Sequence, residues 1–330
     1  MAELPPEQQL TFSTLAAILE GTVHVRSSIL ASAPRCLWAI GLLSWLPDVA
    51  AAITPNVNAV NFTPASGRYR LFAVGSADVG PAWEPYGHVL FHGERNSLSI
   101  TAGDHTEWVV HTHTFADINV GVGLWGFMSL DVGLPVAMTM ESDPDTTSVS
   151  PLSGGGLGDM VVRLRGTPLS SKGGGFGVGL SLGATVPTGD GDQFRGDPGA
   201  GLLANVVLDH QWSTVRLSAN VGTRIRFESA SFYTAEFGSE LTFGLGTLVE
   251  VFDRRLGLAI ELSGRTPFSD FMGSLESTSL EIMLGPRWWV VDGLALELGL
   301  GTGLIQGYGT PEFRFVTGVS WAPSIPVVTR

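Results

Sequence analysis

The sequence predicts an all-β fold, an antiparallel up-and-down transmembrane β-barrel of about 12 strands. Three observations predict it. Apolar and polar residues alternate from about residue 83 almost to the end of the chain. The connections between the alternating segments are short and long in alternation, and tryptophans lie mostly near the short connections. No apolar run approaches the ~20 residues that a membrane-spanning helix needs.

The first 52 residues are interpreted as an N-terminal extension carrying an export signal. The apolar stretch at 36–46 follows basic residues and precedes an A-x-A site, so we expect cleavage after Ala52 and a mature chain that begins at Ile53. The alternative is a buried helix. Cleavage would remove Cys36, the one cysteine, so the mature chain would hold no disulfide.

The remaining chain divides into three parts. Residues 53–81 are predicted to be a periplasmic N-terminal segment, either a free tail or a segment tucked into the lumen. Residues 82–323 are predicted to form the barrel, and residues 324–330 a C-terminal tail.

The strands follow from alternation with a period of two residues. Val215, Leu217 and Val221 share one parity, whereas Arg216 and Arg224 share the other, and a strand sends these two sets to opposite faces. No amphipathic helix separates such segments, which favours an antiparallel meander. The twelve predicted strands lie near 83–100, 105–125, 127–139, 157–166, 176–187, 200–211, 213–227, 236–252, 256–267, 276–291, 294–306 and 311–321.

The connections predict which end of the barrel faces outward. Most of one set are short, with residues 167–175 as the exception, and the other set is longer and more acidic. Short turns at one end and long loops at the other are typical of outer-membrane barrels, where the short turns are periplasmic. The long connections are residues 141–156, 188–199, 228–235 and 269–276.

Tryptophan placement indicates that the apolar face meets lipid, because amphipathic aromatic rings are favoured at the headgroup level. The predicted aromatic girdle is Trp83, Trp125, Trp212, Trp288, Trp289 and Trp321. On this interpretation arginine at Leu258 or Leu296 should destabilise the barrel by ~2–4 kcal/mol near the bilayer midplane. Arginine at Ala259 or Ala295 should enter a polar lumen and cost much less.

The polar parity is predicted to line a pore. Its charges are of both signs, and such charges on one concave face should pair with one another. The lumen-lining candidates are Arg163, Arg165, Arg216, Arg224, Arg226, Arg265, Arg287, Arg314, Asp131, Glu240, Glu261, Glu281, Glu297 and Glu312.

Neither a metal nor a cofactor is expected. His88, His92, His111 and His113 could gather in the lumen, but no cysteine or clear carboxylate joins their spacing, so ordinary polar lumen residues are favoured. The acidic stretches Asp190–Asp192 and Glu141–Asp145 could bind Ca²⁺ but lack the EF-hand spacing, which favours solvated loops.

Sequence motifs give no sign of an enzyme. The stretch Gly121–Gly126 matches G-x-G-x-x-G, but a strand follows it where a dinucleotide site needs a helix. There is no G-x-S-x-G, and nothing singles out Asp104 and His105 as catalytic groups. We therefore expect no catalytic residues and no enzymatic activity.

Several turn and strand-end stretches resemble a known family. Residues 61–77, 186–197, 208–222 and 307–323 together resemble the N-terminal barrel region of large OmpA-family outer-membrane proteins. The resemblance implies an outer-membrane barrel. It also implies acidic calcium-binding repeats and a peptidoglycan-binding domain, which are absent from this chain of 330 residues.

The predicted function is a passive porin-like or narrow solute channel, since barrels of ~8 strands are filled by side chains and those of ~16 leave an aqueous channel. The alternative is a structural or surface-display barrel whose acidic extracellular loops bind a partner or Ca²⁺. The expected location is the bacterial outer membrane, with both termini periplasmic. Expected partners are outer-membrane lipid and lipopolysaccharide, the barrel-assembly machinery and small solutes, whereas the net charge of −13 argues against nucleic acid.

Overall fold

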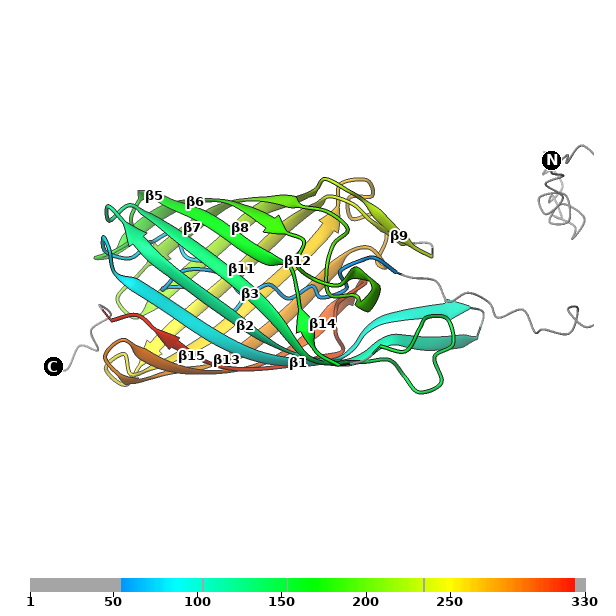
Figure 1. The fold of residues 1–330 in the computed structure, drawn as a ribbon. Helices are drawn as coiled ribbons and strands as arrows, with labels where there is room; N and C mark the ends of the chain where they lie inside the picture. Colours follow the sequence, from blue (N-terminus) through cyan, green and yellow to red (C-terminus); the bar gives the residue numbers. More distant parts are fainter. Residues whose placement is uncertain (1–54, 103, 153, 234, 324–330) are drawn as a thin grey trace, which may run out of the picture. The chain divides into compact units, whose positions relative to one another are not determined.

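Twelve long strands of this protein close into an antiparallel barrel (Figure 1). The computed structural model describes residues 55–102, 104–152, 154–233 and 235–323, which belong to one compact unit. Each barrel strand pairs with its neighbours along the chain, and β1 pairs with β15 to close the cylinder. The predicted 12-strand barrel is thereby confirmed.

The barrel strands lie close to the predicted segments. They are β1 (Pro85–Ala102), β2 (His105–Leu124), β3 (Met128–Glu141), β5 (Met160–Leu169), β6 (Gly175–Val186), β7 (Gly201–Gln211), β8 (Val215–Arg226), β11 (Glu240–Val251), β12 (Leu256–Pro267), β13 (Ser279–Val291), β14 (Leu294–Gln306) and β15 (Phe313–Trp321). Three short strands lie in the connections, namely β4 (Gly156–Leu157), β9 (Ala230–Phe232) and β10 (Ala235–Phe237). The predicted segments 157–166 and 236–252 overlap β4 and β10 without separating them from the barrel strands, and β9 was not predicted.

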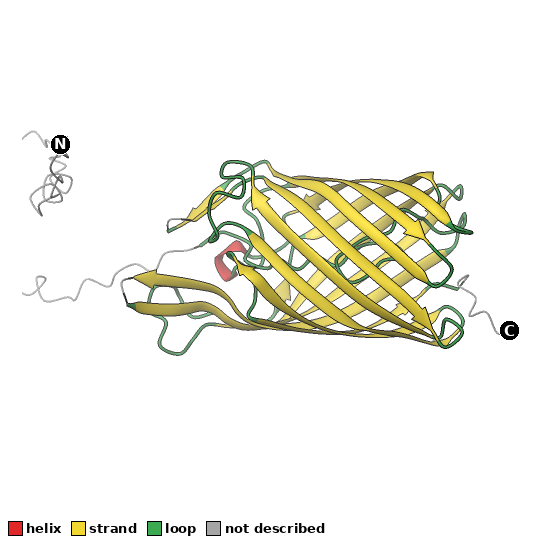
Figure 2. Ribbon diagram, turned by 180° about the vertical axis from the view of Figure 1, so that it is seen from behind, coloured by secondary structure: helices red, strands yellow, loops and turns green. Residues whose placement is uncertain are grey.

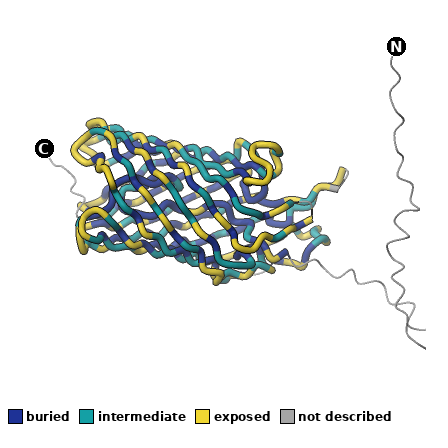
Figure 3. Tube along the Cα trace, turned by 90° about the horizontal axis from the view of Figure 1, so that it is seen from above, coloured by how far each residue is buried: buried dark blue, intermediate teal, exposed yellow. Residues whose placement is uncertain are grey.

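Exposure alternates along the barrel strands (Figure 3). The residues predicted to face lipid all have exposed side chains, whereas their neighbours point into the barrel and are buried or half-buried. These outward residues are Leu217, Val221, Ile225, Leu258, Ile260, Leu296 and Leu298. Within the described part of the chain, no helix has the length and apolar character that crossing a membrane requires.

The two ends of the barrel differ. The short-turn end carries the connections 125–127, 170–174, 212–214, 252–255 and 292–293, and the long-loop end carries 142–159, 187–200, 227–239 and 268–278. At the long-loop end β1 and β2 continue past the last pair of β1 with β15, Arg95 with Phe313, and project as a hairpin (Figure 2).

An apolar cluster closes over the long-loop end. Leu98, Val109 and Val110 of the projecting hairpin belong to it. Side chains from the neighbouring connections complete it, among them Val149, Leu152, Phe194, Phe232, Phe237 and Tyr308. The hairpin and the long loops are therefore folded against one another, and Val57, Ala59 and Val60 belong to the same buried core.

Residues 55–84, called the plug below, run inside the barrel along the length of the lumen (Figure 1). At the long-loop end the N–H of Val57 donates to the carbonyl of Gly191, 3.3 Å away. At the short-turn end the N–H of Trp83 donates to the carbonyl of Gly123, 2.8 Å away. Of the two alternatives left open for residues 53–81, the described residues from 55 onward adopt the second, a segment inside the lumen.

The plug makes part of the lumen apolar. Phe62, Leu71, Phe72 and Val74 pack against inward-facing side chains of the wall, namely Leu90, Leu248, Ala259, Met283, Trp289, Ala295 and Val316. The prediction that Ala259 and Ala295 face an open polar lumen is therefore wrong, although both do point inward. Small residues on the polar parity gave no sign that an apolar segment of the same chain covers them.

Candidate functional site: the occluded lumen

The carboxylate of Glu261 on β12 holds the middle of the plug. Its Oε2 accepts the N–H groups of Phe72 and Val74 at 3.0 and 3.3 Å, and its Oε1 accepts the N–H of Ala73 at 2.8 Å. Glu261 is 1% exposed, so water does not compete for these bonds. Hydrogen bonds to an ionised acceptor are stronger than neutral ones, and three such bonds fix this turn of the plug.

A second clamp lies around Glu297 on β14. Its Oε1 lies 3.0 Å from Nη2 of Arg70 in the plug, and its Oε2 lies 3.2 Å from Nη2 of Arg287 on β13. Arg287 also donates to the carbonyl of Arg70 at 2.6 Å. Nδ1 of His88 accepts from Nε of Arg70 at 3.1 Å. This network gathers two buried guanidinium groups around one carboxylate, and it ties the plug to three strands.

A third clamp holds the part of the plug that leads to β1. Asp209 on β7 accepts from the hydroxyl of Ser76 at 2.7 Å and from the N–H of Ala77 at 2.8 Å. Arg165 on β5 donates to the carbonyl of Ser76 at 2.6 Å. All three clamps join wall residues on the inward parity to polar groups of the plug.

Twelve of the fourteen predicted lumen residues divide into two groups. Arg165, Arg216, Arg265, Arg287, Glu261 and Glu297 bond to the plug. Arg224, Arg226, Arg314, Asp131, Glu240 and Glu281 bond to other side chains around the lumen, and Arg163 has neither kind of partner among the described residues. Glu312 lies apart from both groups, because it precedes β15, is exposed, and accepts from Asn96 at 2.8 Å.

Sequence reasoning missed the carboxylates Glu94, Asp117, Asp197 and Asp209. Three of them lie on inward parities of β1, β2 and β7, so parity alone could have identified them. Asp197 lies in the 187–200 connection, where Arg224 donates to it at 2.6 Å and Arg226 at 3.1 Å. Burial by itself would raise the pKa of Asp197, but the two guanidinium groups lower it below its usual range.

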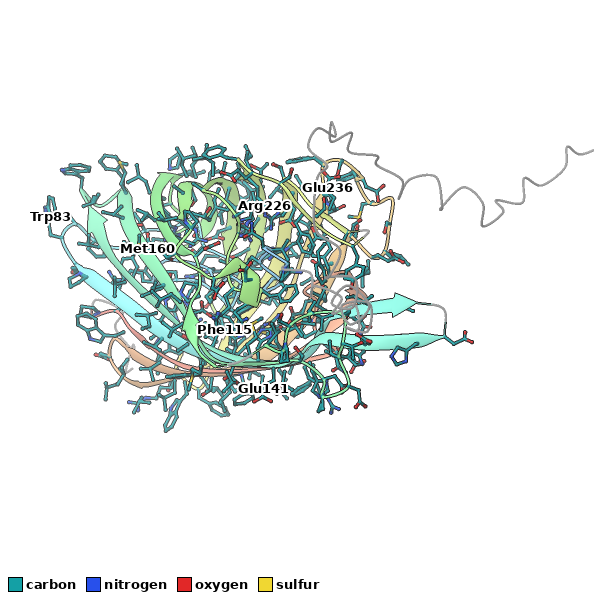
Figure 4. The ribbon with its side chains drawn as sticks, turned by 45° about the vertical axis from the view of Figure 1, so that its right-hand side comes forward. Trp83, Phe115, Glu141, Met160, Arg226 and Glu236 are labelled. Atoms are coloured by element: carbon teal, nitrogen blue, oxygen red, sulfur yellow. The ribbon has the colours of Figure 1, made fainter. Side chains whose placement is uncertain are left out.

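Five of the six predicted girdle tryptophans have exposed side chains near the short-turn end, and Trp83 projects from the rim in Figure 4. Trp289 does not, because it is 8% exposed and packs inside against Leu248 and Ala295. Its inclusion in the girdle is wrong for a simple reason. Trp288 and Trp289 are adjacent on β13, and adjacent strand residues point to opposite faces.

The histidines do not gather as a group of four. His92 and His113 lie close together with Glu94, and one ligand atom of each lies within 4.8 Å of the others. The expectation that no carboxylate joins this spacing is wrong, since Glu94 shares the inward parity two residues after His92. Arg314, however, places Nη2 2.7 Å from Oε2 of Glu94 and Nη1 3.3 Å from Nδ1 of His92. This fixed positive charge opposes a second cation at the same point.

The candidate calcium loops likewise bring no ligand cluster together among the residues that the structure describes. Asp190 caps the short 3₁₀ helix η2 (Gly191–Gln193), where its side chain accepts from the N–H of Asp192. The same carboxylate lies 3.4 Å from Nη2 of Arg195. These groups hold the loop's own conformation.

Between the plug and the wall remains a cavity of about 220 Å³. Its apolar lining includes Phe62 of the plug and Phe115, Val161 and Phe243 of the wall. Figure 4 shows the crowding of side chains around Phe115 and Arg226 inside the barrel. The cavity therefore lies within the barrel, and the plug forms one side of it.

Comparison with known proteins identifies a family that the chain matches and solved structures that share its fold. Residues 88–266 match the model of the family described as "Putative MetA-pathway of phenol degradation". The COG4313 outer membrane channel from Pseudomonas putida F1 has a similar fold, with a TM-score of 0.56 and 14% identity over 74% of this chain and 97% of that one. The NanC porin gives a TM-score of 0.49 and 8% identity over 71% and 98% of the two chains. No curated protein sequence matches the chain.

These findings correct the family assignment and support the predicted class. The resemblance to the OmpA family is wrong, because the chain matches a different family over more than half its length and shares the fold of an outer-membrane channel. The quoted stretches were turn and strand-end signatures that many outer-membrane barrels need. The prediction of a porin-like barrel of the bacterial outer membrane agrees with both findings.

Proposed function

Since the chain belongs to the phenol-degradation family that its residues 88–266 match, we propose that it is an outer-membrane channel for small, largely apolar aromatic molecules. The observation that carries the proposal is a cavity of about 220 Å³ inside the barrel, whose lining combines the rings of Phe62, Phe115 and Phe243 with polar and charged side chains. An engineered cavity of about 150 Å³ lined by apolar side chains holds benzene. A single aromatic ring therefore fits beside the plug.

The plug decides what kind of channel this is. In the part of the chain that the structure describes, the plug is bonded to the wall at three clamps along the lumen, so bulk flow of hydrophilic solutes, as through ~16-stranded porins, is not expected. A solute that enters the cavity lies between the wall on one side and plug residues such as Phe62 and Ala73 on the other. We infer that passage requires a local displacement of the plug. Such a displacement is feasible because only a small number of polar contacts holds each turn of the plug in place.

The orientation follows from the two ends. The short-turn end is periplasmic and the long-loop end extracellular, as in other outer-membrane barrels. The exposed apolar residues of the strands then contact outer-membrane lipid and lipopolysaccharide, and insertion depends on the barrel-assembly machinery. In this orientation the last described residues, after β15, lie on the periplasmic side, whereas Val57 lies at the extracellular mouth.

A disulfide between plug and wall tests the proposal. A Cβ added at Gly75 of the plug would lie 3.9 Å from Cγ2 of Val207 on β7, so cysteines at both positions lie close enough to pair after a small adjustment. Cys36, the one native cysteine, lies in the predicted export signal. Labelled toluene uptake by intact cells should fall in the oxidised double variant and return on reduction.

The single variant Gly75→Cys is the matched control, because it carries the same change in the plug without the cross-link. Its uptake should not respond to oxidant or reductant. Equal toluene uptake with the plug locked and unlocked would reject plug displacement as the route. Uptake no faster than in cells without the protein would reject the channel itself.

The surface-display alternative has weaker support. Its acidic loops use their carboxylates to hold their own backbone, as Asp190 does, and Glu107 of β2 does the same for a neighbouring loop by accepting from Thr147 and Ser148. The cavity in the lumen has no role in a display barrel. We therefore retain the channel as the proposed function.

A further inference from the structure

One arginine inside the barrel has no partner among the described residues. Arg163 on β5 makes no hydrogen bond and no ion pair with the plug or the wall, yet it lines the cavity. The other cavity-lining arginines are all engaged. Arg224 is bound by Asp197, Arg265 lies 3.6 Å from Glu240, Arg165 donates to the plug, and Arg195 lies 3.4 Å from Asp190.

The carboxylate of Asp131 makes no hydrogen bond with Arg163, although its negative charge acts on the guanidinium group. Asp131 on β3 stands directly opposite it in the strand register. Its two oxygens, however, accept from the hydroxyl of Tyr86 at 2.7 Å and from the hydroxyl of Ser129 at 2.9 Å. A guanidinium group has five N–H donors and always carries its charge. Arg163 thus points a charged donor group at the cavity without an acceptor from the protein.

The wall makes room for this side chain. Gly183 on β6 pairs with Arg163, and a Cβ added there would lie 2.8 Å from Cγ of Arg163. Any larger residue at position 183 would press on the arginine where it crosses β6. Asn205 of β7 lies on the same cavity wall, and its Oδ1 makes no hydrogen bond among the described residues. The cavity therefore combines aromatic side chains with an uncommitted charged donor.

We propose that this cavity binds an aromatic carboxylate, with Arg163 as the residue that recognises the carboxylate group. The inference rests on the proposed function and names the substrate class of the same site. The planar guanidinium matches a carboxylate through two parallel hydrogen bonds. A carboxyl group is ionised at neutral pH, whereas a phenol with a pKa near ~10 is not, so the carboxylate is the better partner.

The size of the cavity agrees with this class. Its volume of about 220 Å³ exceeds the ~150 Å³ of a benzene-binding cavity by roughly 70 Å³, about the share of two water molecules and enough for a carboxylate. The acidic groups that line the cavity, Asp117, Asp159 and Glu281, have partners of their own. Both oxygens of Asp159 accept N–H groups, from Gly189 at 3.0 Å and from Asp197 at 2.8 Å. Oδ2 of Asp117 lies 3.0 Å from Nε2 of His92, and Glu281 lies 2.6 Å from Nε of Arg314. They therefore repel an anion less than free carboxylates would.

Binding of matched probes to the purified full-length protein in detergent tests the proposal. Benzoate and benzamide have almost the same shape, but only benzoate carries the charge. Calorimetric titration should show benzoate binding about 10–150-fold tighter than benzamide, the ratio expected for a hydrogen-bonded charge pair in place of a neutral one. Arg163→Met should abolish this preference and leave benzamide binding within about threefold of the wild type.

Two further variants keep the result interpretable. Arg163→Lys retains the charge without the planar fork, so a reduced preference for benzoate should remain. Arg95→Met removes an exposed arginine of β1 outside the cavity and should change neither affinity. Retained benzoate preference in Arg163→Met would overturn the assignment of Arg163.

The two proposals fail in different ways. If the wild type binds benzoate and benzamide equally while toluene uptake still depends on plug release, the carboxylate inference is wrong and the channel stands. If no aromatic probe binds and toluene uptake is absent, the proposed function itself is wrong. Tight benzoate binding with a preference that disappears in Arg163→Met supports both.

Discussion

Replacing Glu261 by glutamine should release the plug without altering the size of the side chain. The glutamine oxygen can keep the bonds from Phe72 and Val74, now as neutral hydrogen bonds. The amide nitrogen would face the N–H of Ala73, a donor against a donor, so the 2.8 Å bond is lost. Bonds to charged acceptors contribute about 1.5–3 kcal/mol and neutral ones about 0.5–1.5, so two weakened bonds and one lost bond together cost about 5 kcal/mol.

A loss of about 5 kcal/mol corresponds to a rise of roughly several thousandfold in the population in which this turn of the plug is detached, relative to the attached state. Single-channel recording in planar bilayers measures that population as the fraction of time spent in larger conductance states. Glu312→Gln is the control, because Glu312 is exposed at the rim and bonds to Asn96 rather than to the plug. An unchanged open fraction in a correctly folded Glu261→Gln barrel would refute the role of this clamp.

Three other changes probe the wall, the exit of the plug and the loop ion pairs. Ile260→Arg on the outer face should lower the free energy of unfolding in lipid by about 2–4 kcal/mol, measured by urea titration in vesicles, whereas a soluble barrel would tolerate it. Gly123→Val should expose the plug to added protease, because a Cβ there would lie 2.0 Å from the carbonyl of Pro81; unchanged protection would contradict this contact. The lowered pKa of Asp197 stabilises the fold above the unfolded value of about 3.9, a contribution lost as pH falls through the folded value. Asp197→Asn should therefore show a flatter decline of unfolding free energy below about pH 4, and an unchanged decline would argue against this ion pair.

Strand positions were accessible from sequence because each barrel strand meets lipid on one face and the lumen on the other. That contrast fixes a period of two residues, so segments such as 294–306 coincide with the observed strand. The lumen was less accessible. Parity shows that Ala259 points inward, but it cannot show that Phe72, almost two hundred positions earlier in the chain, packs in the same apolar cluster.

The candidate site depends on the same long-range contacts. Glu261, Glu297 and Arg287 were identified as inward charges, yet their partners in residues 70–74 lie in a segment without alternation. A charge pattern on a wall indicates that partners exist without saying whether they are solute, water or chain. The lack of a hydrogen-bond partner for Arg163 is harder still to foresee, because it depends on the side-chain geometry by which Asp131 bonds to Tyr86 and Ser129 and not to the arginine opposite it.

Covalent continuity of the plug with β1 has a consequence for how long any opening lasts. A detached plug remains tethered at residue 84, so its return is an intramolecular step at an effective concentration in the millimolar range or above. The population of the closed state is therefore independent of the protein concentration in the membrane, because the plug stays attached to its own barrel. Each barrel has one plug of its own, and the strength of the contacts between plug and wall alone sets how often the channel opens.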